Sequence, residues 1–175
     1  MNDKKYLRVT EILYPFSGLN AIDATIVAKA GYRGTKVHEI CEGIIAGLGE
    51  FGVDDETRPY VESFKKWWGE HREIIAMEKR FWDEEHNFTG QVDLIMKING
   101  ELSIVDIKTS YKPSKTWQLQ GSAYAYLARK HGYDVKRLYF LHLNRNGGEP
   151  NLIEYEIDID FFFDVLRVYN HFFGG

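Results

Sequence analysis

The chain has 175 residues, 44% of them hydrophobic and 27% charged, which is the composition of one globular domain rather than a disordered chain. Its net charge of −4 excludes a histone-like basic coat but not a local basic groove. The single Cys41 excludes an internal disulfide and a four-cysteine metal site within the chain, so we expect no iron–sulfur cluster. The opening residues are polar and no apolar run is long enough to cross a membrane, so we expect a cytoplasmic protein with no membrane contact.

The first part of the chain reads mainly as helix. Thr10 can cap a short helix over residues 10–13, and a second helix is expected over residues 23–30. The segment GTKVHEICEGIIAGLGE, residues 34–50, has apolar side chains at helical spacing and glycine at both ends, which predicts a third helix. Acidic residues open the segment 54–72, which favours a fourth helix there.

From about residue 75 the apolar period changes from helical spacing to two, which is typical of strands. The strands are expected over residues 76–83, 90–98, 101–109, 137–143 and 152–157. Two more helices are expected over 114–131 and 159–173, the first capped by Ser114 and ended by Gly132. Because strands and helices alternate along this part, the order predicts an α/β fold with a mixed β-sheet flanked by helices.

The domain organisation follows from the same pattern. No repeat, linker or low-complexity segment divides the chain, so we expect one domain over residues 1–175. Within it, residues 1–74 form the mainly helical part and residues 75–175 form the sheet core.

One stretch has the pattern of a hairpin and yet carries ionisable groups inside its apolar runs: residues 88–109, FTGQVDLIMKINGELSIVDIKT. The pair Asn99-Gly100 predicts a type I′ turn, because both central residues of that turn need a positive φ. A two-residue loop sets the register of the two strands. Counting outward from the turn then places Asp93 directly opposite Asp106, on one face of the sheet.

The same register places Gln91 opposite Lys108, again on that face. Two carboxylates directly opposed on neighbouring strands repel each other and need a shared proton or a shared cation. A divalent ion that prefers oxygen ligands fits, and Lys108 would then lie near it. The alternative is an ordinary solvent-exposed face, against which stand the apolar neighbours Val105 and Ile107. A β-bulge in the hairpin would shift the register by one residue.

Several short motifs, taken in order, resemble a known family. GQVD (90–93), DIKT (106–109) and QGSAY (120–124) resemble the GxxD … (D/E)xK … QxxxY signature of the RecB-like branch of the PD-(D/E)XK nuclease superfamily. The upstream RGTKVHE is similar to the histidine-bearing helix of that branch. VTEIL resembles the segment that opens small exonucleases of the phage and mitochondrial type. The resemblance spans about residues 8–143.

The resemblance implies a restriction-endonuclease-like core and a role for each matched residue. Asp93 and Asp106 would bind a metal ion, with the backbone carbonyl of Ile107 as a further oxygen ligand. Lys108 would orient or activate the attacking water and stabilise negative charge on the phosphate. His38 would be an additional metal ligand, although a histidine at the edge of an apolar helix face can also be a purely structural residue.

Further residues have two readings each. The resemblance implies that Gln120 and Tyr124 lie over the site and hold the lysine or the substrate phosphate, while core packing would explain Tyr124 equally well. Glu78 either matches the upstream acid, as a further metal ligand, or is an ordinary charge at a strand edge. The candidate DNA contacts, which could instead form a solvated face or part of the core, are Lys112, Lys115 and Trp117.

These features predict metal-dependent hydrolysis of phosphodiester bonds in DNA. Hard oxygen ligands with one imidazole suit Mg²⁺ or Mn²⁺. An exonuclease of DNA recombination, repair or end processing, acting on single-stranded DNA or DNA ends, is favoured because no sequence-reading module is visible. The alternatives are a structure-specific endonuclease of the same fold and a non-catalytic nucleic-acid-binding subunit.

Overall fold

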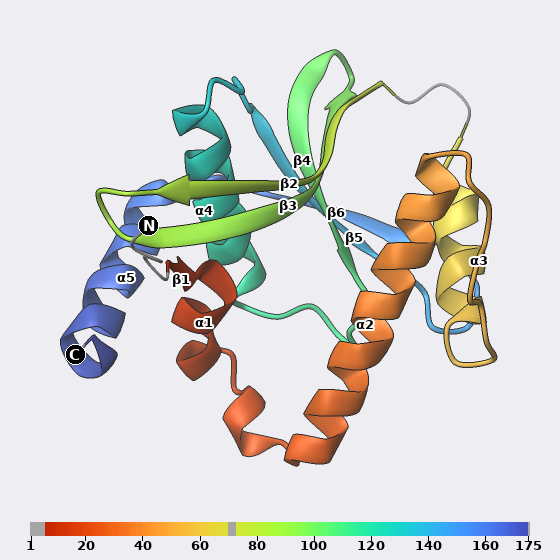
Figure 1. Cartoon of the computed structure of the whole chain (residues 1–175), viewed down its shortest axis with the longest axis horizontal. Helices are drawn as coiled ribbons and strands as arrows, with labels where there is room; N and C mark the ends of the chain where they lie inside the picture. The colour runs from red at the N-terminus through yellow and green to blue at the C-terminus, as the bar shows by residue number, and fades with distance from the viewer. Residues whose placement is uncertain (1–5, 70–72, 175) are drawn as a thin grey trace, which may run out of the picture.

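A computed structural model describes residues 6–69 and 73–174, and it has an α/β fold with a mixed sheet between helices (Figure 1). The helices are α1 (Val9–Leu13), α2 (Ala24–Ile45), α3 (Arg58–Trp67), α4 (Trp117–Lys130) and α5 (Ile159–Phe173), with short 3₁₀ turns η1 (Tyr14–Phe16) and η2 (Leu19–Ala21). The strands are β1 (Leu7–Arg8), β2 (Ile74–Asp83), β3 (Phe88–Ile98), β4 (Glu101–Lys108), β5 (Arg137–His142) and β6 (Asn151–Tyr155). The predicted fold class is confirmed.

The sheet is built around β3. Strand β2 pairs antiparallel along one edge of β3. The other edge changes partner, because β1 pairs parallel at its start and β4 pairs antiparallel from Leu94 to Ile98. Strand β4 continues parallel to β5, which is antiparallel to β6. The switch from β1 to β4 opens a fork in the sheet beside Asp93.

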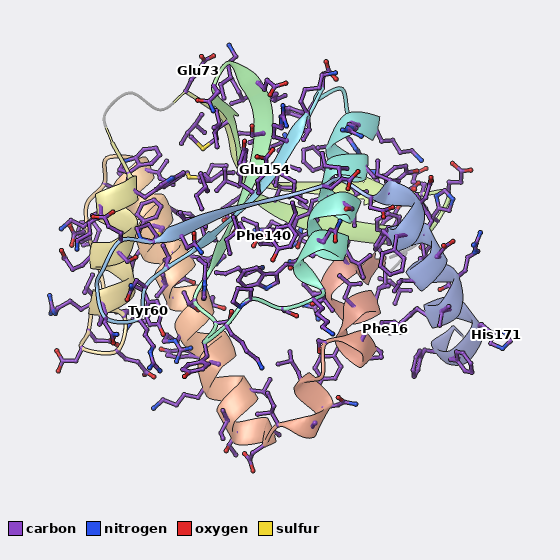
Figure 2. All side chains as sticks on the ribbon, turned by 180° about the vertical axis from the view of Figure 1, so that it is seen from behind. Phe16, Tyr60, Glu73, Phe140, Glu154 and His171 are labelled. Atoms are coloured by element: carbon purple, nitrogen blue, oxygen red, sulfur yellow. The ribbon has the colours of Figure 1, made fainter. Side chains whose placement is uncertain are left out.

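Both faces of the sheet are covered, so adjacent residues of one strand enter different cores. On β4, Ile104 packs with α1, α4 and α5, whereas Val105 packs with α2 and α3. Figure 1 shows these two groups of helices at opposite ends of the molecule. Phe140 of β5 lies in the interior, while His171 of α5 points outward at the edge (Figure 2).

The two helices expected over residues 23–30 and 34–50 form one continuous helix, α2. Asp23 caps its start by accepting a hydrogen bond from the backbone N–H of Thr25 at 2.8 Å. Three glycines, Gly31, Gly34 and Gly43, lie inside α2, and the helix continues through them because its second half is held by burial against the sheet. Glycine therefore does not mark the start of this helix.

Other helix starts also differ from the expectation. Helix α1 begins at Val9, and Glu11 accepts the backbone N–H of Arg8 at 2.8 Å, so Thr10 is not its cap. Helix α4 begins three residues after Ser114, whose hydroxyl accepts the N–H of Thr116 in the preceding turn. Its predicted end is confirmed, because the following Gly132 has a positive φ of 88°.

The remaining boundaries agree within a few residues, and α5 matches its predicted range. The helix expected over 54–72 begins only at Arg58 and ends at Trp67, and residues 70–72 lie outside the described part. Strand β1 is not predicted, since two residues carry no periodicity. None of the described helices combines the length and apolar character needed to cross a bilayer.

Candidate active site

The predicted hairpin forms, but its ladder ends one pair before the two aspartates. Asn99 and Gly100 both have positive φ, and the ladder runs from the turn to the pair Leu94–Val105. Asp93 and Asp106 are therefore not a ladder pair. The fork in the sheet separates the strands there, and the Asp93 carboxylate accepts the backbone N–H of Ile107 at 2.7 Å.

His38 of α2 faces this fork. Its Nε2 lies 2.8 Å from the backbone oxygen of Ile107, and its Nδ1 lies 3.5 Å from Asp93 Oδ2. Burial alone would lower the pKa of His38, but the Asp93 carboxylate outweighs it and raises the pKa to about 9. The same contact, with the charge of Lys108 and the N–H of Ile107, outweighs burial and holds the pKa of Asp93 below its ordinary value. His38 thus contacts Asp93 and the Ile107 carbonyl, two of the groups with which the sequence analysis expects it to bind a metal ion.

Asp106 and Lys108 lie two residues apart on the same face of β4. Asp106 is only 2% exposed, and its Oδ2 lies 2.6 Å from Lys108 Nζ. That oxygen has no well-directed hydrogen bond among the described residues. Burial raises the pKa of Asp106 to about 6; Lys108 opposes this shift and Asp93 adds to it. The pKa of Asp93 is therefore lowered and the pKa of the neighbouring Asp106 is raised, so Asp106 is the first of the two to take up a proton as the pH falls.

Glu78 joins the group through a kink in β2. The ladder pairs on either side, Met77–Leu94 and Lys79–Val92, would place Glu78 opposite Asp93, but Glu78 has a φ of 48° and leaves the ladder. A positive φ at a residue other than glycine is strained, and such strain gathers at functional sites. Ligand atoms of Glu78, Asp93 and His38 all lie within 4.8 Å of one another.

Burial, with the charge of Asp93, raises the pKa of Glu78 to about 7. Its Oε2 accepts a hydrogen bond from Gln91 Nε2 at 2.5 Å. The prediction that Gln91 lies opposite Lys108 is wrong, because the ladder of β3 with β4 ends at Leu94–Val105; on its other edge Gln91 pairs with Arg80 of β2. The physical reason is the fork: β4 has already left β3 at this point of the sheet.

Gln120 and Tyr124 lie one turn apart on α4, and Gln120 Nε2 donates to the Tyr124 hydroxyl at 2.9 Å. Tyr124 is buried, and burial together with the charge of Asp106 raises its pKa. Its ring packs directly on the backbone of Gly90, the first residue of the GQVD motif. Tyr124 therefore serves the core and also borders the acidic group.

Gly90→Ala should push the Tyr124 ring away from β3. A Cβ at this position would lie 2.6 Å from Tyr124 Cε1, closer than atoms pack. We expect a loss of about 1–3 kcal/mol in the free energy of unfolding, measured by urea denaturation. Gly31→Ala on α2 is the matched control, because among the described residues no atom outside the surrounding turn of α2 lies within 4 Å of its added Cβ, and alanine favours a helix. Equal stability of the wild type and Gly90→Ala would contradict this packing.

The candidate DNA contacts fall into two classes. Lys112 and Lys115 are exposed in the loop between β4 and α4. Trp117 is only 4% exposed, and its ring stacks on Phe140 with centroids 5.2 Å apart. A ring so deeply enclosed has no free face for a base, so we do not carry Trp117 forward as a DNA contact.

Comparison with known proteins decides the family. Residues 50–171 match the family model described as the PD-(D/E)XK nuclease superfamily. The chain belongs to this superfamily. The matched range includes Glu78, Asp93, Asp106 and Lys108 but not His38, which lies upstream of it.

Solved structures were compared as well, and the first of them supports the fold alone. A "Putative exonuclease" from Eubacterium rectale has a TM-score of 0.54 and 14% identity, with 98% of this chain and 80% of that chain covered. The structure of SSO0001 has a TM-score of 0.49 and 14% identity, with 98% and 78% covered. No curated protein matches the sequence significantly.

The residues at the fork fit the divalent cation that nucleases of this superfamily typically use. Glu78 and Asp93 lie with His38 in one group of close ligand atoms, and Asp106 lies near enough for the charge of Asp93 to add to the burial that raises its pKa. A cation bound among these carboxylates would relieve their mutual repulsion. The buried Asp106 oxygen without a directed hydrogen bond is a further ligand atom suited to a cation. Carboxylates with one imidazole suit Mg²⁺ or Mn²⁺.

Divalent cations should therefore stabilise the fold. A ligand that binds only the native state adds about 2.7 kcal/mol at a hundredfold excess over its Kd. We expect the Tm to rise with Mn²⁺ in thermal unfolding, and Glu78→Gln to reduce the rise. The matched control is Glu85→Gln, because Glu85 belongs to a second group of acids and histidine whose central carboxylate is already paired with Lys130. A rise unchanged by Glu78→Gln, or abolished by Glu85→Gln, would place the cation elsewhere.

Proposed function

We propose that this chain is a single-domain, Mg²⁺- or Mn²⁺-dependent deoxyribonuclease of the RecB-like branch, and most specifically an exonuclease of DNA recombination, repair or end processing. The observation that carries the proposal is the convergence of His38, Glu78 and Asp93 beside Asp106 and Lys108 at the fork of the sheet. The motif order GQVD, DIKT and QGSAY supports the branch.

Each residue has a separate task in this proposal. Asp93, Asp106, Glu78, His38 and the Ile107 carbonyl would hold the cation. A cation bound there would polarise the scissile phosphate and lower the pKa of a bound water. The other groups position the substrate and stabilise charge.

Lys108 carries the positive charge nearest to Asp106, and its Nζ also lies 5.5 Å from the centre of the Phe140 ring. The Phe140 ring limits where the Lys108 ammonium can move, so the positive charge of Lys108 is already positioned to stabilise negative charge on the phosphate. The Gln120–Tyr124 pair borders the same space from α4. We propose that this pair orients Lys108 or a phosphate oxygen, with Lys112 and Lys115 following the backbone of the strand.

The test is digestion of end-labelled single- and double-stranded DNA with Mg²⁺, Mn²⁺ or EDTA. We expect cation-dependent release of short products from the ends, while covalently closed circular DNA stays intact. Cleavage of the circle would establish an endonuclease instead. DNA retained with Mn²⁺ but never cut would support the non-catalytic subunit and refute the enzyme.

A further inference from the structure

A hollow lies over strands β2 and β3, on the face opposite to the one where Gly90 packs against α4. Its volume of 430 Å³ falls within the size range of small-molecule sites, about 300–1,000 Å³. The lining residues come from the start of the chain, from α1, from β2 and from β3: Tyr6, Arg8, Glu11, Arg80, Trp82 and Thr89. We call this hollow the Trp82 pocket.

The Trp82 pocket is joined to the candidate active site by two hydrogen bonds. Arg80 Nη2 donates to Gln91 Oε1 at 2.5 Å, and Gln91 Nε2 donates to Glu78 Oε2 at 2.5 Å. Arg80 pairs with Gln91 in the β2–β3 ladder, and Trp82 pairs with Thr89, so these four side chains lie on one face. The Arg80 end of the pocket is therefore two hydrogen bonds away from Glu78, one of the acids that would hold the cation.

The charges in the pocket favour one anionic group. Arg8 is paired with Glu11, whose Oε1 lies 2.9 Å from its guanidinium. Arg80 bonds to a neutral amide, and no carboxylate forms an ion pair with it within residues 6–69 and 73–174. The guanidinium of Arg80 is a planar donor that suits a phosphate. The pocket thus holds about one uncompensated positive charge.

Trp82 supplies the aromatic part of the pocket. It is 46% exposed, and its ring makes an edge contact with His131 at a centroid distance of 5.2 Å and an angle of 70°. An exposed but positioned indole is a platform on which a planar group can stack at little entropic cost. Trp67, Trp68 and Trp117, the other tryptophans, are all partly or fully covered.

We propose that the Trp82 pocket binds one unpaired nucleotide of the substrate strand next to the scissile phosphate, with its base on Trp82 and its phosphate at Arg80. The inference rests on the proposed nuclease function and deepens it. A base can stack on a side chain only after it has left a duplex, so the preferred substrate is a single strand or a frayed end. Stacking is available to every base, so the pocket does not read sequence.

The first experiment measures whether Trp82 and a base act together. Binding of a fluorescein-labelled oligothymidylate is compared with binding of an abasic oligomer of the same length, in EDTA so that cleavage does not interfere. We expect Trp82→Ala to weaken binding of the oligothymidylate about tenfold, within the range measured for one stacked base. It should leave binding of the abasic oligomer unchanged, because that strand has no base to stack.

Two control variants test whether the loss of affinity comes from the aromatic ring of Trp82. Trp82→Phe should retain most of the affinity, since phenylalanine keeps an aromatic face. Phe172→Ala on α5 removes a side chain that is 71% exposed and should change neither affinity. If Trp82→Ala weakens both oligomers equally, or weakens neither, the stacking proposal is wrong.

The second experiment concerns the phosphate. Arg80→Gln should reduce the slope of log affinity against log salt concentration by about 0.7, the value for one phosphate contact on a single strand. An unchanged slope would remove Arg80 from the phosphate contact. A wild type that cleaves DNA but shows no coupling between Trp82 and the base overturns the pocket while keeping the nuclease. A wild type that neither binds nor cleaves overturns both.

Discussion

Asp106→Ala should abolish DNA cleavage, with a loss of at least about a thousandfold, because in the proposed mechanism this carboxylate would bind the cation and it lies against Lys108. The fold should remain. Burial raises the pKa of Asp106 from its ordinary value of about 4 to about 6, so the carboxylate, which is largely ionised at neutral pH, lowers the stability of the fold there. This cost develops between about pH 4 and about pH 6 and is fully present above about pH 6, and removing the charge takes it away.

Single-turnover cleavage with Mn²⁺ and thermal unfolding in EDTA measure these two expectations. Asp106→Asn keeps the size of the side chain, so its Tm at neutral pH should equal or exceed that of the wild type. Asp134→Asn is the control, since its carboxylate is 79% exposed and pairs only with Lys136 among the described residues. Activity of Asp106→Ala within about tenfold of the wild type would refute the assignment.

Asp83→Ala should cause the largest loss of stability among the polar substitutions, about 3 kcal/mol. The Asp83 carboxylate is wholly buried at the end of β2. It accepts hydrogen bonds from the backbone of Glu85 at 3.0 Å, His86 at 2.6 Å, Tyr126 at 2.8 Å and Lys130 at 2.6 Å. Its removal leaves these donors unpaired and detaches the β2–β3 turn from α4.

The dependence of this loss on pH has a definite sign. Burial by itself would raise the pKa of Asp83, but the hydrogen bonds from Lys130, His86 and Tyr126 hold it well below its ordinary value. A depressed pKa contributes stability that is present above about pH 4 and is lost as the pH falls further. Urea unfolding of the wild type and Asp83→Ala should therefore differ fully at pH 7 and less at pH 3.

The control for Asp83 is Glu85→Ala. The side chain of Glu85 is 73% exposed and lies 3.5 Å from Lys130, so its loss should cost less than about 0.5 kcal/mol. A similar cost for both variants would show that the buried network adds nothing beyond a surface ion pair. A difference independent of pH would show that the Asp83 charge is not its source.

Much of the architecture follows from local signals in the sequence. The Asn99-Gly100 turn and the register of the hairpin up to Leu94–Val105 were predictable, because a type I′ turn sets the pairing of the residues next to it. Periodicity likewise located the strands β2 to β6 and helix α5. The motif order pointed to the superfamily that the family model confirms.

The strand pairing beyond the hairpin and the backbone conformation of Glu78 were decided by the tertiary structure. The predicted pairing of Asp93 with Asp106 extends the register of the turn by one pair, and it is wrong because the ladder of β3 with β4 ends at Leu94–Val105. Beyond that point β3 pairs with β1, a two-residue strand that lies far away in the sequence. The kink at Glu78 likewise depends on the strands around it, since nothing in its own sequence favours a positive φ.

The same distinction explains α2 and Asp83. Glycine lowers helix propensity locally, yet α2 runs through Gly31 and Gly34 because burial against the sheet outweighs that preference. The partners of Asp83 on α4 are brought to it only by packing. Turn chemistry and periodicity act over a few residues, so the sequence by itself determined the elements and their motifs. The fork, the kink and the buried charge network arise from contacts between distant segments, so only the folded chain could decide them.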